Sequence, residues 1–295
     1  MKTITKAIIP VAGLGTRFLP AATAIPKEML TIVDKPVIQY IVEEAVEAGI
    51  KEILFVTRES KVAIKKHFQP DQELIEALKR KNKNEELNLL KKISKLAKIG
   101  YINQVEQSGL ANAIYYGKKF ANGEPVAVLL GDTIITNGGL GQLIKLYESN
   151  GMDNVLVKYL EDKKDVTKYG IISPTEKNPK IFNKEIKYFQ VKDLVEKPSV
   201  EKAPSRYSVA CRYVFNPNIF SLIEKTKPGA GGEYQITDTM KFLAEENKLL
   251  ATILQGNKYD IGGKIDFVKA NIDFALMDIG IKKEIKKFLI DKFSL

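Results

Sequence analysis

Short apolar runs alternate with amphipathic stretches over the first 130 residues of the chain. Residues 7–11, 52–56 and 125–130 are nearly continuous apolar runs, which are typical of strands covered on both faces. Apolar positions recur with helical spacing in residues 36–48, which stop at a glycine, and again in residues 111–120. The alternation predicts βαβ units and an α/β fold with a mixed, mainly parallel sheet and helices on both faces.

The rest of the chain adds strands and then returns to helices. Strand-like segments bounded by turn residues stand at residues 101–105, 155–160, 170–172, 187–195 and 207–215. Helical segments stand at residues 61–68, 141–150, 217–225, 236–247 and 264–295. We expect one domain over residues 1–295, with a polar helical excursion at 71–98, an additional small sheet region at 155–215 and a C-terminal helix at 264–295.

Cysteine and histidine are almost absent from the chain. Cys211 and His67 are single, and there is no tryptophan. Disulfide frameworks and Cys/His zinc sites are therefore excluded. A Ser-His-Asp triad would have to use His67, and no G-x-S-x-G motif accompanies it. Any bound metal must be held by oxygen ligands, which favour magnesium or manganese, so the carboxylates are the candidate ligands.

The chain is basic, with a formal net charge of +10 and a sequence pI near 9.3. Such a charge suits nucleic acid, an anionic membrane or small phosphorylated substrates. Much of it lies in residues 79–95 and 281–288, where lysines alternate with apolar residues at helical spacing and aromatic residues are few. This pattern favours solvated helix faces over a nucleic-acid surface. No apolar run is long enough to span a membrane and no signal-like segment precedes the first strand, so we expect a cytoplasmic location without a membrane partner.

A glycine-rich turn, Gly-Leu-Gly-Thr-Arg at residues 13–17, follows the first strand directly. Glycine lets the backbone approach a phosphate or a base there, and the N–H groups of the turn can face an anion. The dinucleotide-binding fingerprint would need a third glycine where Phe18 stands. Arg17 and Lys27 place two cations after the turn, which suits a triphosphate. The alternative is that the glycines serve only a tight turn.

The blocks at residues 13–20 (Gly-Leu-Gly-Thr-Arg-Phe-Leu-Pro) and 25–30 (Ile-Pro-Lys-Glu-Met-Leu) resemble the signature of the sugar-1-phosphate nucleotidylyltransferases. Further blocks in that family's order stand at residues 33–36, 124–128, 168–170, 195–198, 203–205, 212–213, 228–231, 233–238 and 259–262. Within the family they are most similar to the bacterial enzymes that use UTP and glucose 1-phosphate. The resemblance implies a Rossmann-like nucleotidyltransferase core. It also implies in-line attack by a sugar-1-phosphate oxygen on the α-phosphorus of a nucleoside triphosphate, with release of pyrophosphate.

The resemblance further implies which residues take part in the chemistry. Asp132, which directly follows a predicted buried strand, and Asp260 would hold Mg²⁺. Arg17 and Lys27 would contact the nucleotide phosphates, with Lys27 near the α-phosphate, and Lys197 would hold the sugar phosphate. Because a phosphate monoester is already a nucleophile, positioning and charge neutralisation suffice, and no histidine base is needed.

Substrate binding is assigned by the same resemblance. Glu196 would accept hydrogen bonds from sugar hydroxyls, and Gly170 would leave room for the sugar ring. The nucleotide would be bound by Ala12, Gly13, Gly15, Thr16, Gln104 and Gly109. Gln107 is an alternative to Gln104 for the base-binding glutamine. The resemblance also implies a homo-oligomer, either a dimer or a tetramer.

The chain departs from its nearest relatives in the family at several places. Residues 109–113 read Gly-Leu-Ala-Asn-Ala where the uridylyltransferases have G-L-G-H-A, and residues 260–262 read Asp-Ile-Gly where they have D-C-G. The approach to residue 109 is short, as in the thymidylyltransferases. An enzyme that uses dTTP or another hexose 1-phosphate is therefore the alternative substrate assignment. A non-catalytic nucleotide-sugar sensor is the alternative of another class, but the chain keeps both aspartates and both lysines.

Overall fold

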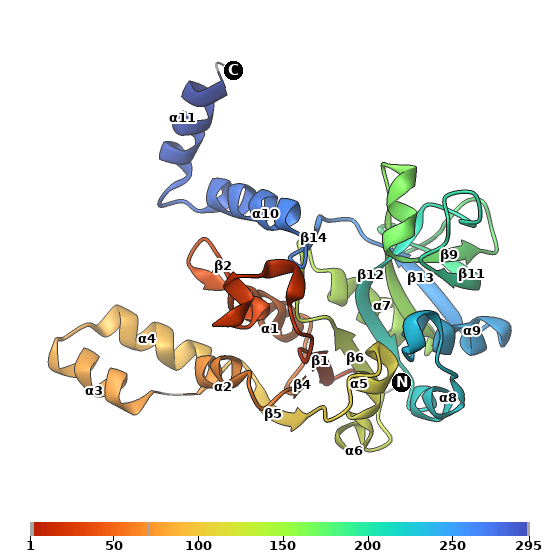
Figure 1. Cartoon of the computed structure of the whole chain (residues 1–295), viewed down its shortest axis with the longest axis horizontal. Helices are drawn as coiled ribbons and strands as arrows, with labels where there is room; N and C mark the ends of the chain where they lie inside the picture. Colours follow the sequence, from red (N-terminus) through yellow and green to blue (C-terminus); the bar gives the residue numbers. More distant parts are fainter. Residues whose placement is uncertain (1–2, 70, 294–295) are drawn as a thin grey trace.

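A ten-stranded sheet forms the frame of the molecule (Figure 1). The computed structural model describes residues 3–69 and 71–293. The strands of this sheet are β1 (Lys6–Pro10), β4 (Glu52–Thr57), β5 (Lys98–Asn103), β6 (Val126–Leu129), β8 (Asp153–Tyr159), β9 (Gly170–Pro174), β10 (Lys180–Phe182), β11 (Ile186–Glu196), β12 (Tyr207–Phe215) and β13 (Leu249–Ile253). Their order is β10-β11-β13-β8-β12-β6-β1-β4-β5, and β9 pairs with both β11 and β12.

Helices cover both faces of the sheet, as the sequence predicts. They are α1 (Val37–Glu47), α2 (Val62–Phe68), α3 (Gln72–Arg80), α4 (Asn84–Ile93), α5 (Leu110–Tyr115), α6 (Lys118–Ala121), α7 (Gly139–Asn150), α8 (Ile219–Lys225), α9 (Ile236–Glu245), α10 (Lys264–Met277) and α11 (Lys282–Phe293). Adjacent residues of β1 point to opposite faces. Ile9 packs in one apolar core with residues of α1 and α7, and Ile8 packs in a second core with residues of α5 and α9.

The sheet is mixed, which confirms the predicted α/β class. β5, β4, β1 and β6 are parallel neighbours. β12 lies antiparallel to β6, and the pairs beyond it are antiparallel except for β8 with β13. The strands of the 155–215 region continue this sheet. Two additional two-stranded sheets are formed by β2 (Thr31–Ile32) with β3 (Lys35–Pro36) and by β7 (Thr133–Ile135) with β14 (Lys258–Asp260).

Two predicted helices are each divided in two, so the sequence interpretation was wrong in these details. The helix expected at 111–120 is α5 followed by α6, with Gly117 packed so closely on β1 that a Cβ there would lie 2.2 Å from Cδ1 of Ile8. The single C-terminal helix expected at 264–295 is α10 followed by α11. Asp278 Oδ1 accepts a hydrogen bond from the amide of Gly280, a turn that ends α10. Residues 294–295 of that expected helix lie outside the described residues.

Some strand boundaries also differ from the prediction. β5 begins at Lys98, within the expected excursion, because it pairs in parallel with β4 from that residue onward. β13 was not predicted: its five residues Leu-Leu-Ala-Thr-Ile follow a helix closely and give no alternating pattern. Short apolar runs of this kind are ambiguous between helix and strand.

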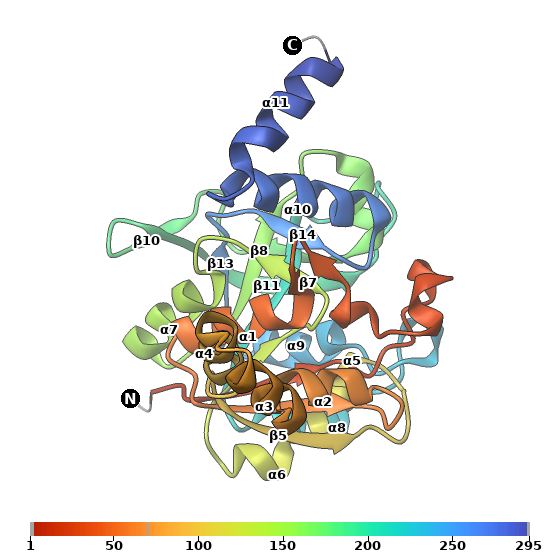
Figure 2. The same cartoon turned by 90° about the vertical axis from the view of Figure 1, so that its left-hand side faces the viewer.

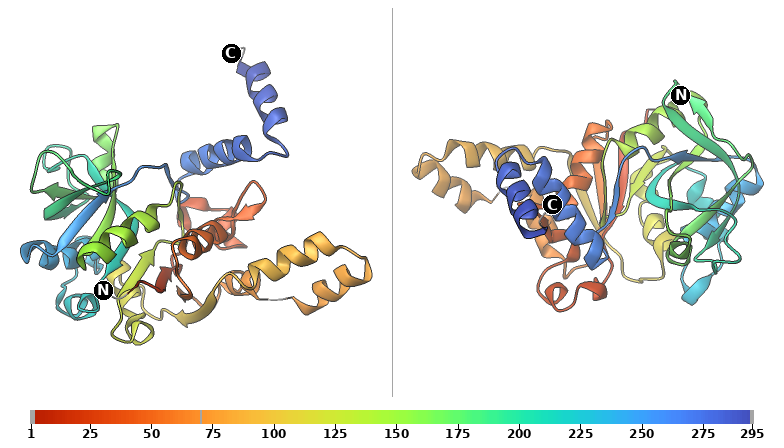
Figure 3. Two further views of the ribbon diagram at one scale, coloured as in Figure 1. Left: turned by 180° about the vertical axis from the view of Figure 1, so that it is seen from behind. Right: turned by 90° about the horizontal axis from the view of Figure 1, so that it is seen from above.

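Two helical segments extend away from the body of the molecule. α3 and α4 lie side by side as an arm beyond α2, and α11 projects from the end of α10 (Figures 1 and 2). Views from behind and from above show the same two extensions (Figure 3). No helix in residues 3–69 or 71–293 is long and apolar enough to cross a membrane.

A buried ion pair ties β12 to the helices on one face of the sheet. Arg212 on β12 is fully buried, and its Nη2 lies 2.6 Å from Oε2 of Glu44 on α1. The same Nη2 donates to the carbonyl oxygen of Thr133 at 2.7 Å, and Glu44 Oε1 accepts the amide of Leu140 at the start of α7. Because both charged side chains are paired, the ion pair holds β12, α1 and the start of α7 together around Thr133, the first residue of β7.

Removing one partner of this pair should destabilise the protein strongly. Arg212→Ala leaves the Glu44 carboxylate buried and uncompensated, which costs about 3–5 kcal/mol in unfolding free energy. Urea denaturation followed by circular dichroism measures the loss. Lys118→Ala, which breaks an exposed pair with Glu224, is the control and should leave the unfolding midpoint nearly unchanged. An equally small effect of Arg212→Ala would contradict this account.

Candidate active site

The turn after β1 meets the end of β6 at the carboxyl edge of the parallel strands. Gly15 adopts a left-handed φ of 71° before the short 3-10 helix Thr16–Phe18. The amide of Gly131, directly after β6, donates to the carbonyl oxygen of Pro10 at 3.4 Å. A Cβ at Gly131 would lie 2.4 Å from Cγ1 of Val11. Glycine at position 131 therefore allows the two strand ends to touch, and Asp132 follows immediately.

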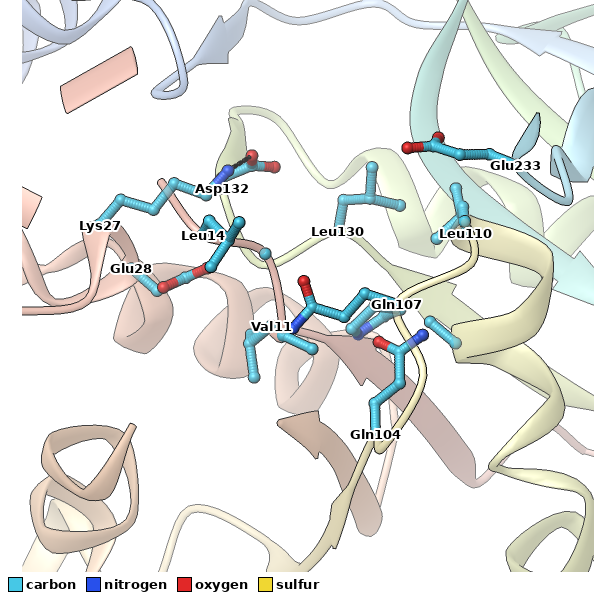
Figure 4. A pocket seen from close by; sticks show the side chains of 15 residues that line it. Val11, Leu14, Lys27, Glu28, Gln104, Gln107, Leu110, Leu130, Asp132 and Glu233 are labelled. Atoms are coloured by element: carbon cyan, nitrogen blue, oxygen red, sulfur yellow. Dashed lines mark hydrogen bonds and ion pairs between the residues drawn. The ribbon is translucent and has the colours of Figure 1, made fainter. Parts of the chain in front are cut away.

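A cavity of about 370 Å³ opens at this edge (Figure 4). Its lining includes six residues that the sequence interpretation assigned to the site: Ala12, Gly13, Lys27, Gln104, Gly109 and Asp132. Figure 4 shows Lys27 and Asp132 meeting on one side of the cavity, while Gln104 and Gln107 lie together on another. Ligands of open α/β sheets commonly bind at the carboxyl ends of the strands, so the position of this cavity is typical of a substrate site.

Lys27 and Asp132 form a short ion pair at the cavity wall, with Nζ and Oδ2 2.5 Å apart. Burial opposes the charge on Lys27, but the neighbouring Asp132 carboxylate outweighs it and raises the pKa of Lys27 above its usual value. Burial likewise opposes the charge on Asp132, and Lys27 outweighs it, so the pKa of Asp132 is lowered. Both groups are therefore charged at neutral pH, an ammonium and a carboxylate beside the glycine turn.

The second candidate metal ligand, Asp260, is brought next to Asp132 by the small sheet of β7 and β14. Asp260 pairs with Thr133, and the amide of Ile261 donates to the carbonyl oxygen of Asp132 at 2.9 Å. Arg17 Nη1 lies 3.9 Å from Asp260 Oδ2. Two cations and two carboxylates that are far apart in the sequence thus gather around one edge of the sheet.

The two aspartates fit a metal ion that is shared with a phosphate ligand. In the described part of the chain, no group of three or more Asp, Glu, His or Cys side chains is placed to hold a metal by itself. Mg²⁺ is usually bound in nucleotide-dependent enzymes by one or two carboxylates together with substrate phosphates. Asp132 and Asp260 supply the hard oxygen donors that such a site needs.

The two glutamines considered for base binding both line the cavity, and only one of them is fixed by a neighbour. Gln104 is buried, and its Nε2 donates to Oδ1 of Asn112 at 2.8 Å. Gln107 is exposed and has no side-chain partner among the described residues. Gly109 has φ +109° and lies against the backbone of Tyr234, where a Cβ would approach the carbonyl oxygen to 2.6 Å.

The residues expected to bind the sugar form a neighbouring group that does not line this cavity. Thr237 Oγ1 donates to Glu196 Oε2 at 2.9 Å, and a Cβ at Gly170 would lie 3.1 Å from that same carboxylate oxygen. Lys197 has φ 44°, and its Nζ lies 3.5 Å from Glu196 Oε1.

This group adjoins the strand that bears Asp260. Lys258 of β14 lies over the ring of Tyr169, the residue directly before Gly170, with its Nζ 4.0 Å from the ring centroid. The two sets of predicted site residues are therefore neighbours across β14. Gly15, Thr16 and Arg17 also lie outside the cavity lining, further along the glycine turn.

Several residues of the site were not singled out from the sequence. Glu28 lines the cavity although it is almost fully buried, and both of its carboxylate oxygens accept from Lys61 Nζ at 2.8 Å. Burial raises the pKa of Glu28. Glu233 also lines the cavity, and Arg212 supports the residue after Asp132. All three residues stand in blocks that resemble the family signature, but nothing in the sequence beside Lys27 signals that Glu28 is buried.

The single histidine and the single cysteine lie outside the cavity lining. His67 Nε2 lies 2.9 Å from Gln39 Oε1 on the side of α1, and burial lowers its pKa. Cys211 lies on β12, and burial raises the pKa of its thiol. A raised pKa keeps a thiol protonated and weakly nucleophilic. The cavity therefore offers charges and hydrogen bonds, and neither of these two nucleophiles.

Comparisons with known proteins show what the chain as a whole is similar to. The sequence profile of the nucleotidyl transferase family matches residues 6–275. A curated relative, UTP–glucose-1-phosphate uridylyltransferase of Bacillus subtilis, is 45% identical over 291 residues, which cover 98% of this chain and 97% of the relative.

Solved structures show the same likeness over the whole fold. The UTP-bound UGPase of Acinetobacter baumannii superposes with a TM-score of 0.86 at 34% identity, covering 97% of this chain and 99% of its own. A UDP-glucose pyrophosphorylase complexed with UDP-glucose superposes with a TM-score of 0.80 at 34% identity, covering 93% and 100%.

Two glycines that line the cavity should respond differently to an added methyl group. Nothing lies within 4 Å of the position that a Cβ would take at Gly13, so Gly13→Ala should keep its thermal unfolding midpoint and weaken nucleotide binding. Gly109→Ala combines positive φ with a backbone clash and should lose about 2 kcal/mol or more of unfolding free energy. Thermal melts and nucleotide titrations of both variants separate the effects. Normal stability in Gly109→Ala would contradict the packing described for Tyr234.

Proposed function

The chain belongs to the nucleotidyl transferase family, and from this premise we propose that it transfers a uridylyl group from UTP to glucose 1-phosphate, giving UDP-glucose and pyrophosphate. The observation that carries the proposal is the cavity after β1, where Lys27 and Asp132 lie beside the glycine turn. The 45% identity to a UTP–glucose-1-phosphate uridylyltransferase along nearly the full length of the chain supports the same reaction. The UTP-bound and UDP-glucose-bound structures of similar fold support the same pair of ligands.

The reaction requires one bond to form and one to break. A phosphate oxygen of glucose 1-phosphate attacks the α-phosphorus of UTP, and the bond from that phosphorus to the oxygen bridging to the β-phosphorus breaks on the opposite side. The bridging oxygen leaves with pyrophosphate and carries the developing negative charge. The attacking oxygen already bears charge at neutral pH, so the chain needs to hold the reactants in line and to neutralise charge, rather than to remove a proton.

Lys27 and Arg17 are the cations proposed to neutralise the nucleotide phosphates. Lys27 is held by Asp132 until phosphate oxygens compete for its ammonium group, which keeps it aimed at the cavity. Lys197 is proposed to bind the phosphate of the sugar substrate. The Glu196 carboxylate, oriented by Thr237, is proposed to accept hydrogen bonds from sugar hydroxyls above Gly170.

Asp132 and Asp260 are proposed to hold Mg²⁺ together with the substrate phosphates. A bound Mg²⁺ would supply charge neutralisation at the phosphate oxygens. Their adjacency across β7 and β14 supports this assignment, as does the oxygen-only donor set that the composition leaves available.

Gln104 is proposed to select the base. Gln104 Nε2 donates to Asn112 Oδ1, which orients the side-chain amide of Gln104 and leaves its Oε1 free to accept a hydrogen bond. Uracil and thymine share an imide N–H that can donate to this oxygen, and cytosine lacks it. A dTTP-dependent enzyme or one that takes another hexose 1-phosphate is the second candidate, favoured by the altered block at residues 109–113.

We also propose that the chain assembles as a homo-oligomer, with neither nucleic acid nor a membrane as partner. The projecting α11 supports this, because its apolar residues are exposed: Phe288, Ile290 and Phe293 are 58%, 42% and 60% accessible. Light scattering measures the oligomeric state.

Activity should depend on a divalent metal and on Asp132. Chelation with EDTA should abolish pyrophosphate release, and added Mg²⁺ should restore it. Asp132→Asn should lower kcat by about 10²-fold or more while the protein stays folded, because the substitution removes both a proposed Mg²⁺ ligand and the ion-pair partner of Lys27. Asp165→Asn, in an exposed i,i+3 pair with Lys168, is the matched control. Near-normal turnover by Asp132→Asn would refute the assignment of this aspartate.

The nucleotide preference should be UTP first, with appreciable use of dTTP. Uracil and thymine differ by one methyl group, which supports about 10- to 200-fold discrimination, and the altered block favours the smaller figure. CTP should be rejected strongly because it leaves the Gln104 acceptor unpaired, and purines should fail on size. Values of kcat/KM for UTP, dTTP, CTP, ATP and GTP with glucose 1-phosphate measure this. A preference for ATP or GTP would overturn the base site, and dTTP above UTP would establish the second candidate.

A further inference from the structure

Glu28 and Lys61 form a buried ion pair to which the proposed reaction assigns no task. Both carboxylate oxygens of Glu28 accept from Lys61 Nζ at 2.8 Å, and the side chains of Lys61 and Glu28 are only 8% and 2% exposed. Glu28 lies on the same side of the cavity as Lys27 (Figure 4). Because both of its oxygens are engaged, this carboxylate is poorly placed to bind a ligand itself. Its position next to Lys27 points to a role in holding that residue.

Glu28 is the residue at which the chain returns to the interior of the protein. It lies in the 3-10 helix η3 (Lys27–Met29), and residues 19–27 before it are all exposed or half-buried. An apolar side chain is the usual anchor at such a point, because burying a charge is costly unless the charge is paired. The aliphatic part of Glu28 also lies against the turn that bears Asp132, since a Cβ at Gly131 would lie 3.6 Å from Glu28 Cγ.

Two ion pairs hold η3, and the nucleotide would affect only one of them. Lys27 reaches Asp132 after β6, whereas Glu28 reaches Lys61, the residue directly before α2. Under the proposed function, phosphate oxygens draw the ammonium group of Lys27 away from Asp132, so the first pair separates when the nucleotide binds. The pair of Glu28 and Lys61 includes neither of these groups and stays intact.

We propose that the ion pair of Glu28 and Lys61 is a positioning pair, which holds η3 in place and so keeps Lys27 at the α-phosphate once Lys27 has left Asp132. The proposal rests on the proposed function, which places Lys27 at that phosphate. A doubly hydrogen-bonded ion pair suits the task because it fixes direction as well as distance. Transfer by positioning depends on this precision, since a small misplacement of a catalytic group costs much of the rate.

Replacing both partners by methionine tests the pair without leaving a buried charge unpaired. Glu28→Met with Lys61→Met substitutes apolar side chains of similar volume, so the thermal unfolding midpoint should stay the same or rise. The kcat for uridylyl transfer should nevertheless fall about 10-fold or more, as expected for a misplaced Lys27. Lys61→Arg, which keeps a charged pair with Glu28, should lose less of the rate.

A positioning role differs from a general structural role in its dependence on Lys27. In a Lys27→Met background, the double methionine replacement should lower kcat by less than about two-fold, because the residue that the pair positions is already gone. An equal loss of kcat in both backgrounds would mean a general disturbance of the site and would overturn the proposal.

Lys35→Met with Glu43→Met is the matched control. It removes a half-buried ion pair in which Lys35 Nζ lies 2.6 Å from Glu43 Oε2, and neither residue lines the cavity. This variant should leave kcat unchanged. A loss as large as that of the Glu28 and Lys61 replacement would show that the rate responds to any such ion pair, and would overturn the role assigned to this one.

Hydrogen exchange tests the holding of η3 without turnover. The amides of Met29 and Leu30 donate within this turn at 2.8 and 3.2 Å, so their exchange reports whether the turn is held. In the ligand-free protein, the double methionine replacement combined with Lys27→Met removes both ion pairs, and these amides should exchange about 10-fold faster than in Lys27→Met alone. Exchange no faster than in Lys27→Met would refute the proposal. A wild type that fails to turn over UTP would refute the proposed function alone, because this exchange needs no substrate.

Discussion

The 2.5 Å ion pair between Lys27 and Asp132 is the contact on which the site depends. It joins the segment after the glycine turn to the end of β6, and each charge offsets what burial costs the other. A ligand that separates this pair must compensate both buried charges. It must bring an anion to Lys27 and a cation to Asp132. Under the proposed function, a complex of Mg²⁺ with the nucleotide would supply both charges.

The surrounding fold holds these charges in place through contacts between distant parts of the chain. Gly131 lets the ends of β1 and β6 touch, and the small sheet of β7 and β14 sets Asp260 beside Asp132. Beneath β7, the buried Arg212 donates to the carbonyl oxygen of Thr133, so the turn that bears Asp132 rests on an ion pair with Glu44. Rigid support of this kind is what a mechanism based on positioning requires.

The sequence was informative wherever the chemistry lies in one continuous segment. The apolar strand before Asp132 and the glycines after β1 predicted a ligand site at the end of the parallel strands, and the structure brings six of the assigned residues to one cavity. Asp260 needed the family resemblance, because β7 and β14 are three-residue strands without a readable pattern. Arg212 and Glu28 gave no signal of their burial, since a charged residue in sequence favours a surface position. The break before α11 depends on a local Asp278 turn within an otherwise helical pattern.

The central claim is that the site transfers the nucleotidyl group directly, by holding charges in line, without a covalent bond to the chain. His67 and Cys211 lie outside the cavity lining, and burial raises the pKa of the Cys211 thiol, which keeps it protonated and weakly nucleophilic. The most direct measurement is the stereochemical course at the α-phosphorus, followed with UTP that carries a single sulfur at that phosphorus. A single in-line displacement predicts inversion of configuration in the UDP-glucose analogue. Retention would mean two successive displacements through a nucleotidylated residue, and would contradict the account.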